Sequence, residues 1–253
     1  MSLFGNLKSE GLEESQDRLG GFAPLETDIY TGVVKAFYAG KSAGGAQSVS
    51  IILAVPGGKE YRETFYVTNK KGENFFINKQ DQTKKVPLPG FTIVDDICLC
   101  TTGKPLAEQD AEDKVINLYD SDAKKELPKS VPMLMEVVGQ TVSLGILKQL
   151  ENKNVKNEST GEYEATAETR DTNATDKVFH TETKMTTVEA RNGAETPAFW
   201  DGWLERNKGK TRDKRSIKEG EAGATGAPKA SGKPGAPPQA GNAAPRASLF
   251  GKK

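Results

Sequence analysis

The sequence predicts a mainly β protein with one short buried helix and polar ends. Three segments between residues 28 and 69 alternate apolar and polar side chains, which is the pattern of half-buried strands. Residues 90–102 instead carry apolar side chains at helical spacing, and residues 219–247 are mostly glycine, alanine and proline. Hydrophobic residues make up 35% of the 253 residues, which is enough for one modest core.

The first three predicted strands form an antiparallel meander. The first strand, residues 28–38, is expected to place Ile29, Thr31, Val33, Lys35 and Phe37 on one side and Tyr30, Val34 and Tyr38 on the other. The second strand, residues 47–55, points Val49, Ile51, Leu53 and Val55 inward. A tight Pro-Gly-Gly connection leads into the third strand, residues 59–69.

The rest of the predicted body is less regular. Residues 103–132 are polar and are interpreted as an insertion. Residues 133–150 form a strong strand, residues 152–161 a polar turn, and residues 162–185 one or two further strands. Residues 196–207 fit a short amphipathic helix with Thr196 as its N-cap.

Both ends are expected to be flexible, so the body is predicted to span residues 27–207. Residues 1–26 form an arm, and residues 208–253 form a basic tail that cannot bury enough apolar surface to offset its ordering entropy. From residue 201 onward there are 12 Lys and Arg against 5 Asp and Glu, although the whole chain is neutral. The pair Leu3-Phe4 recurs as Leu249-Phe250, and these pairs are either docking peptides for a partner or a coincidence.

The residue types argue against an enzyme, a metal site and a bound cofactor. One histidine, His180, and two cysteines cannot complete a tetrahedral zinc site without carboxylates, and no nucleophile motif accompanies the histidine. Cys98 and Cys100 lie in an apolar run and are expected to be reduced core thiols in a cytoplasmic protein. Asp95 and Asp96 are expected near a helix start, where the dipole favours them. The sequence contains no run of about 18 apolar residues, so no transmembrane helix is expected.

Aromatic rings and cations gather between residues 59 and 79. A ring offers a base a flat surface for stacking, and a cation offers a phosphate a counter-charge, so a sheet carrying both suits single-stranded nucleic acid. The alternative is ordinary core packing of the rings, with the cations in water. In the third strand, Phe65 and Val67 are expected to point inward and Arg62 and Tyr66 outward.

Candidate contact residues for DNA extend beyond that segment. Phe75 and Phe76 are adjacent, so in an extended backbone at least one of the two rings is expected to be exposed or to cap the barrel. The full candidate set is Lys35, Tyr38, Lys41, Arg62, Tyr66, Lys70, Lys71, Phe75, Phe76, Lys79 and Lys148.

Three patches resemble a known family. The segments Tyr30–Val34, Tyr66–Lys71 and Val138–Ile146 are similar to strands of bacteriophage single-stranded DNA-binding proteins. The resemblance covers roughly residues 27–205. It implies an OB fold, which is a five-stranded, partly open barrel, here with a short helical insertion. It also implies a role in phage DNA replication, recombination and repair in the host bacterial cytoplasm. The basic tail departs from the acidic tail that many members carry.

The sequence therefore favours a protein that binds and protects single-stranded DNA with little sequence preference. Its expected partners are that DNA, replication or recombination proteins at the Leu-Phe pairs, and further copies of the chain. A viral structural or assembly protein is the alternative, because the same β body and termini could serve assembly. RNA binding uses the same physics as DNA binding and stays open.

Overall fold

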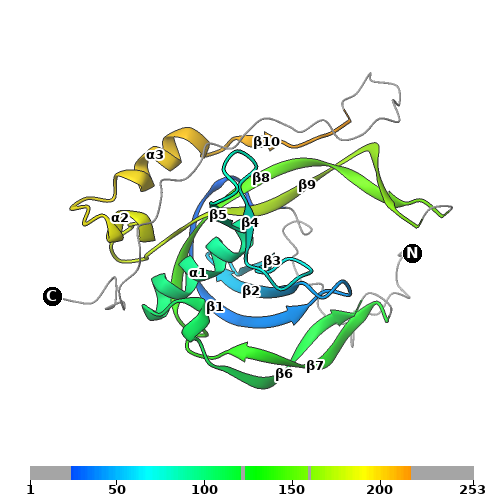
Figure 1. Cartoon of the computed structure of the whole chain (residues 1–253), viewed down its shortest axis with the longest axis horizontal. Coiled ribbons are helices and arrows are strands. Elements are labelled where there is room, and N and C mark those ends of the chain that lie inside the picture. Colours follow the sequence, from blue (N-terminus) through cyan, green and yellow to red (C-terminus); the bar gives the residue numbers. More distant parts are fainter. Residues whose placement is uncertain (1–23, 121–122, 159–160, 218–253) are drawn as a thin grey trace, which may run out of the picture.

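The computed structural model describes residues 24–120, 123–158 and 161–217, and these form a mainly β body (Figure 1). Its main sheet is antiparallel, apart from one short parallel pair, and does not close into a barrel. The strand order is β10-β8-β1-β2-β3, with β9 paired to β8 and a β6–β7 hairpin attached through β7 to β1. The mainly β prediction is therefore confirmed.

The strands and helices follow one another along the chain with short connections. The strands of the main sheet are β1 (Asp28–Lys41), β2 (Gln47–Val55), β3 (Lys59–Tyr66), β6 (Ala111–Asp120), β7 (Lys125–Leu134), β8 (Thr141–Lys156), β9 (Tyr163–Phe179) and β10 (Thr211–Asp213). A separate two-stranded sheet holds β4 (Phe75–Ile77) and β5 (Lys85–Pro87). The helices are α1 (Pro89–Thr102), the 3-10 turn η1 (Leu106–Glu108), α2 (Thr187–Arg191) and α3 (Ala198–Asn207).

Strand β1 joins the two halves of the sheet because it pairs with β8 along its first part and with β2 along its second. Its ladder with β2 shifts register between Val34 and Ala36, so Lys35 is the extra residue of a bulge. The bulge reverses the alternation that follows it. Phe37 is therefore buried on the same side as Val34, and the predicted grouping of Phe37 with Val33 is wrong.

The core lies between the sheet and α1. Val34 and Phe37 from β1 and Ile51 and Leu53 from β2 are fully buried there, together with Ile97 from α1. The predicted buried helix is thus confirmed. Cys98 and Cys100 are free and buried in α1, and burial raises the pKa of both thiols far above its usual range.

A smaller apolar cluster fixes α3 against the outer side of β8. Trp203 packs with Leu147 and Phe179, and its ring atoms would lie 3.0 Å from a Cβ at Gly145. A larger residue at that position would push the indole away by a few tenths of an ångström, so glycine allows the close approach. The amphipathic helix is confirmed, but its N-cap is Pro197 rather than the predicted Thr196.

The predicted insertion and turn between residues 103 and 161 need correction. Residues 103–132 contain β6 and most of β7, which form a regular hairpin. Residues 135–140 form the connection to β8, and Val137 is buried there outside any strand. Strand β8 then continues to Lys156 through the first half of the predicted turn. One long strand, β9, fills most of residues 162–185.

The ordered body is longer at both ends than predicted. Leu25 is buried, and its backbone N–H and C=O both bond to the side chain of Asn173. Residues 208–217 run along β8, where the amide of Asn152 accepts hydrogen bonds from the backbone N–H groups of Ser216 and Ile217. The boundary predicted at residue 208 is therefore wrong. The rest of the predicted arm and tail lies outside the described residues, as do Leu3, Phe4, Leu249 and Phe250.

The two adjacent aspartates lie in the middle of α1 and not at its start. Asp95 accepts a hydrogen bond from the backbone N–H of Leu106, at 2.9 Å. Asp96 accepts one from the Thr187 hydroxyl, at 2.6 Å, and so connects α1 to α2. Burial, together with the nearby charge of Asp95, raises the pKa of Asp96 to about 6.

Replacing Asp96 by Asn is expected to stabilise the protein at pH 8. The folded-state pKa lies above the unfolded value, so the charged carboxylate destabilises the fold above pH 6, and this penalty disappears as pH falls toward 4. Asparagine keeps the acceptor for Thr187 without the charge, for a gain of about 2 kcal/mol at pH 8 and little at pH 4. Urea unfolding at both pH values measures it. A gain from Asp96→Asn that is equal at pH 8 and pH 4, or a loss of stability at pH 8, would contradict the assignment.

Candidate nucleic-acid interface

One face of the β1–β2–β3 sheet points away from the core. Strand β2 sends Ile51 and Leu53 inward, so Ser48, Ser50 and Ile52 face the other way. The registers place Tyr38 and Thr64 on either side of Ser50. Arg62 lies beside Ile52, and Tyr66 lies beside Ser48. Alternation therefore lines up Tyr38, Arg62 and Tyr66 on one surface, hereafter the β1–β3 face.

A hollow of about 180 Å³ opens on the β1–β3 face. Its lining includes Tyr38 from β1, Ser50 and Ile52 from β2, Arg62 and Thr64 from β3, and Leu118 from β6. Leu118 reaches it because the β6–β7 hairpin, drawn along the lower edge of Figure 1, is anchored to β1 where Tyr38 pairs with Met133. The hollow thus combines a ring, a guanidinium and aliphatic walls, and this combination suits a flat polar group such as a base.

An ion-pair cluster borders this hollow. Glu60 contacts Lys35 through one carboxylate oxygen and Arg62 through the other, each at 2.9 Å. Hydrogen bonds from Arg62 and Lys35 lower the pKa of Glu60 below its usual value. All three side chains are at least one-third exposed, so water screens the pairs and a phosphate could compete for either cation.

Two further candidate lysines meet at the turn between β1 and β2. A Cβ built on Gly44 would lie 3.2 Å from the Lys70 side chain, and one on Gly45 would lie 4.0 Å from the Lys41 side chain. Lys41 and Lys70 therefore flank the same turn. Lys71 follows in the next turn, where its backbone N–H bonds to the Asn69 side chain. These cations lie beyond the Tyr66 end of the β1–β3 face.

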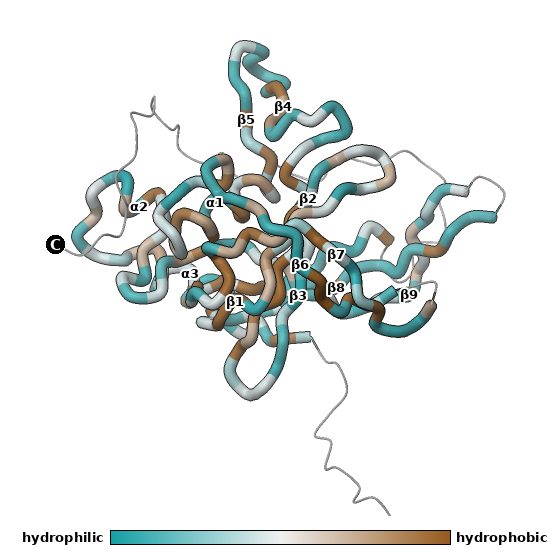
Figure 2. Tube along the Cα trace, turned by 90° about the horizontal axis from the view of Figure 1, so that it is seen from below, coloured by the Kyte–Doolittle hydropathy of each residue, from teal (hydrophilic) through white to brown (hydrophobic). Residues whose placement is uncertain are grey.

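The candidate rings at Phe75 and Phe76 lie on the separate β4–β5 hairpin, which stands away from the main body in Figure 2. Lys85 covers the Phe75 ring at 4.3 Å from its centroid, while Phe76 is 47% exposed. The expectation that at least one of the two rings is exposed is confirmed. Lys79 is exposed in the loop between the two strands. Neither these rings nor Lys79 line the hollow on the β1–β3 face.

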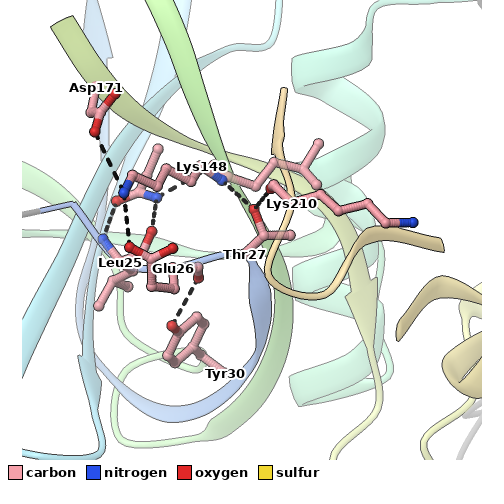
Figure 3. A network of polar contacts seen from close by, with 9 residues as sticks. Leu25, Glu26, Thr27, Tyr30, Lys148, Asp171 and Lys210 are labelled. Carbon is pink, nitrogen blue, oxygen red and sulfur yellow. Dashed lines mark hydrogen bonds and ion pairs between the residues drawn. The ribbon is translucent and has the colours of Figure 1, made fainter. Parts of the chain in front are cut away.

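Lys148 is not brought to the β1–β3 face. It lies in β8 within the polar network of Figure 3, where its ammonium group contacts Glu26 at 2.8 Å and Asp171 at 3.5 Å. Its backbone N–H bonds to Thr27. These contacts neutralise the cation and connect the segment before β1 to β8 and β9. Lys148 therefore has a structural role.

Of the eight residues that line the hollow, the candidate set named only Tyr38 and Arg62; Ser50, Ile52, Thr64 and Leu118 are among those it missed. Ser50, Ile52 and Thr64 alternate along their strands with residues that were predicted to point inward. The same alternation therefore implied that these three side chains face outward. Leu118 was missed because residues 103–132 were interpreted as a polar insertion. The run Val115–Tyr119, which is rich in β-branched and aromatic residues, was the available signal for a strand there.

Other parts of the described structure offer little chemistry. Within residues 24–120, 123–158 and 161–217, no three His, Cys, Asp or Glu side chains group as metal ligands. A second hollow, of about 270 Å³, lies beside α3 and β10, but its carboxylate, Asp176, already accepts a hydrogen bond from the Trp203 indole. No helix in the part of the chain described here is both long and apolar enough to cross a bilayer.

Comparison with known proteins adds no relative. No family model matches the sequence, and a search of curated proteins returns no match. Function is therefore inferred from the β1–β3 face itself.

Proposed function

We propose that this protein binds single-stranded nucleic acid, with DNA as its natural ligand, along the β1–β3 face. The observation that carries the proposal is the outward alignment of Tyr38, Arg62 and Tyr66 beside a hollow of about 180 Å³. Tyr66 is 54% exposed although it is a large ring in a regular strand. An exposed ring is what stacking with an unpaired base requires, and cations on the same surface can contact the phosphates.

The strand arrangement supports an OB-like reading of the fold. Strands β1, β2 and β3 form a meander, β1 continues onto β8, and β8 pairs with β9, while α1 lies between β3 and β8 in the chain. Where a ladder would close the barrel, side chains bridge instead: Glu63 of β3 accepts a hydrogen bond from the backbone N–H of Thr175 in β9, at 2.9 Å. We regard this as a partly open barrel. In OB folds the faces of the second and third strands bind oligonucleotides.

The rings and the cations on this surface have different expected contacts. Tyr38 and Tyr66 offer ring faces to bases, while Arg62, Lys41 and Lys70 lie where phosphates would pass between them. A duplex hides the faces of its bases within the stack, so the rings can engage only an unpaired strand. Sequence preference is expected to be low, because every base has a π-face.

Fluorescence anisotropy with labelled oligo-dT tests the proposal. Labelled oligo-dT should bind at least about tenfold more tightly than a duplex of equal length, and its affinity should fall as salt increases because phosphate contacts release counterions. An RNA oligonucleotide of equal length, measured under the same conditions, decides whether the ligand is DNA. Equal affinity for duplex would contradict stacking, and no binding at low salt would favour the assembly role instead.

A further inference from the structure

Strand β6 is an open edge of the sheet. Among the described residues it pairs only with β7, and Figure 1 shows it as the outermost strand of its hairpin. Half of its backbone N–H and C=O groups therefore point away from β7, where a further strand could bond to them. The strand is also unusually apolar on its solvent side: Val115 is 70% and Tyr119 is 62% exposed.

The sequence of this edge is complementary to itself. Residues 114–120 read Lys-Val-Ile-Asn-Leu-Tyr-Asp, with Asn117 at the centre. In an antiparallel pair with a second copy, Asn117 would face Asn117, and every other residue would face its mirror position. Ile116 then lies opposite Leu118, Val115 opposite Tyr119, and Lys114 opposite Asp120.

Each of the three pairs on either side of Asn117 is favourable, and symmetry makes each of them occur twice. Opposed residues share one face of a sheet, so the exposed Val115 side chain would cover the exposed Tyr119 ring of the other copy. On the other face, Ile116 and Leu118 would form a continuous apolar strip between two ion pairs of Lys114 with Asp120. Shifting the register by two residues in one direction would place Glu112 opposite Asp120, so charge favours the centred register.

Contacts within one chain are compatible with this pairing. Asp120 contacts Lys129 at 2.8 Å and Lys114 contacts Glu112 at 2.9 Å, but Lys114 and Lys129 are each more than 40% exposed. Such screened pairs are worth little, so they can be shared or exchanged when a second copy approaches.

We propose that two copies of this protein associate through antiparallel pairing of their β6 strands, centred on Asn117. The inference does not depend on nucleic-acid binding. A single pair of edge strands buries less surface than a standard interface, so the dimer is expected to form at roughly 10–500 µM. Leu118 lies in this β6–β6 interface, hereafter the seam, and also lines the hollow. The dimer would therefore hold the two β1–β3 faces close to its two-fold axis.

Charge exchange across the seam provides the test. Sedimentation equilibrium of the full chain, freed of nucleic acid, should show an average mass that rises with concentration. Lys114→Asp and Asp120→Lys each create two like-charge contacts and should each raise the dimer dissociation constant roughly tenfold or more. An equimolar mixture of the two variants should recover the association, because each negative strand then meets a positive one.

A second pair of variants distinguishes specific pairing at the seam from nonspecific association through exposed apolar side chains. Tyr119→Lys should weaken the dimer, while Tyr163→Lys, at a ring that is 71% exposed on the tip of β9, should leave it unchanged. Thermal melting confirms that each variant is folded. A wild-type chain that stays monomeric at about 500 µM would overturn the proposal. Failure of the mixture to recover association, or equal loss with Tyr163→Lys, would overturn it as well.

Discussion

Replacing Tyr38 and Tyr66 together by alanine is expected to weaken oligo-dT binding on the order of a hundredfold, because two stacked bases each lose about 1–3 kcal/mol. Both rings lie on the β1–β3 face, one beside Ser50 and the other beside Ser48. Strand spacings put them roughly 12 Å apart, so one strand of DNA can span both. Each single variant should show a smaller loss of oligo-dT affinity than the double variant.

The salt dependence of that double variant identifies the lost interaction. Rings carry no charge, so the slope of log affinity against log salt should be unchanged, whereas Arg62→Ala should reduce that slope. Tyr163→Ala is the control, because it removes a tyrosine ring that is 71% exposed, more than the 54% of Tyr66, from the tip of β9. If the control weakens binding as much as the double variant, or if the double variant binds normally, the β1–β3 face is not the binding surface.

Replacing Gly90 by alanine is expected to destabilise the fold by about 3 kcal/mol, which is roughly 10 °C in melting temperature for a chain of this length. Gly90 is the second residue of α1, and a Cβ there would lie 2.4 Å from the carbonyl oxygen of Tyr66. The obstacle is backbone, so no side-chain rotation relieves it. Helix α1 would have to move from β3 and disturb Val94 and Ile97, both fully buried.

Gly202 provides the control for that substitution. It lies inside α3, where a Cβ would meet no atom within 4 Å. Alanine is the better helix former, so Gly202→Ala should stabilise the protein by about 0.5–1 kcal/mol. Urea unfolding of the two variants measures both effects. Unchanged stability of Gly90→Ala would show that α1 does not pack against Tyr66 as described.

Elements that depend on local periodicity were predictable. Strand β2 has the predicted bounds, because inward and outward residues alternate along it without interruption. The inward side of Phe65 and the outward side of Arg62 and Tyr66 followed from the same rule in β3. Helix α2 was also readable in principle, because Thr186 and Glu189 form a capping box, a signal that was overlooked.

Elements that depend on distant partners were not predictable. The bulge at Lys35 arises from pairing with β2, so the side on which Phe37 lies cannot be read from β1 alone. Lys148 looked like a free cation, but Glu26, 122 residues away, pairs with it. Residues 208–217 read as a flexible tail, yet Asn152 and the edge of β8 hold them in place.

The chain by itself therefore determined the strand β2 and which rings and cations alternate outward in β3. Those properties depend on side chains a few residues apart, and a period of two or 3.6 residues expresses them directly. Tertiary structure alone decided that Tyr38 and Leu118 meet Arg62 around one hollow, and that β6 remains an open edge. Strand order and register set both features, and these depend on contacts between residues that lie far apart in the sequence.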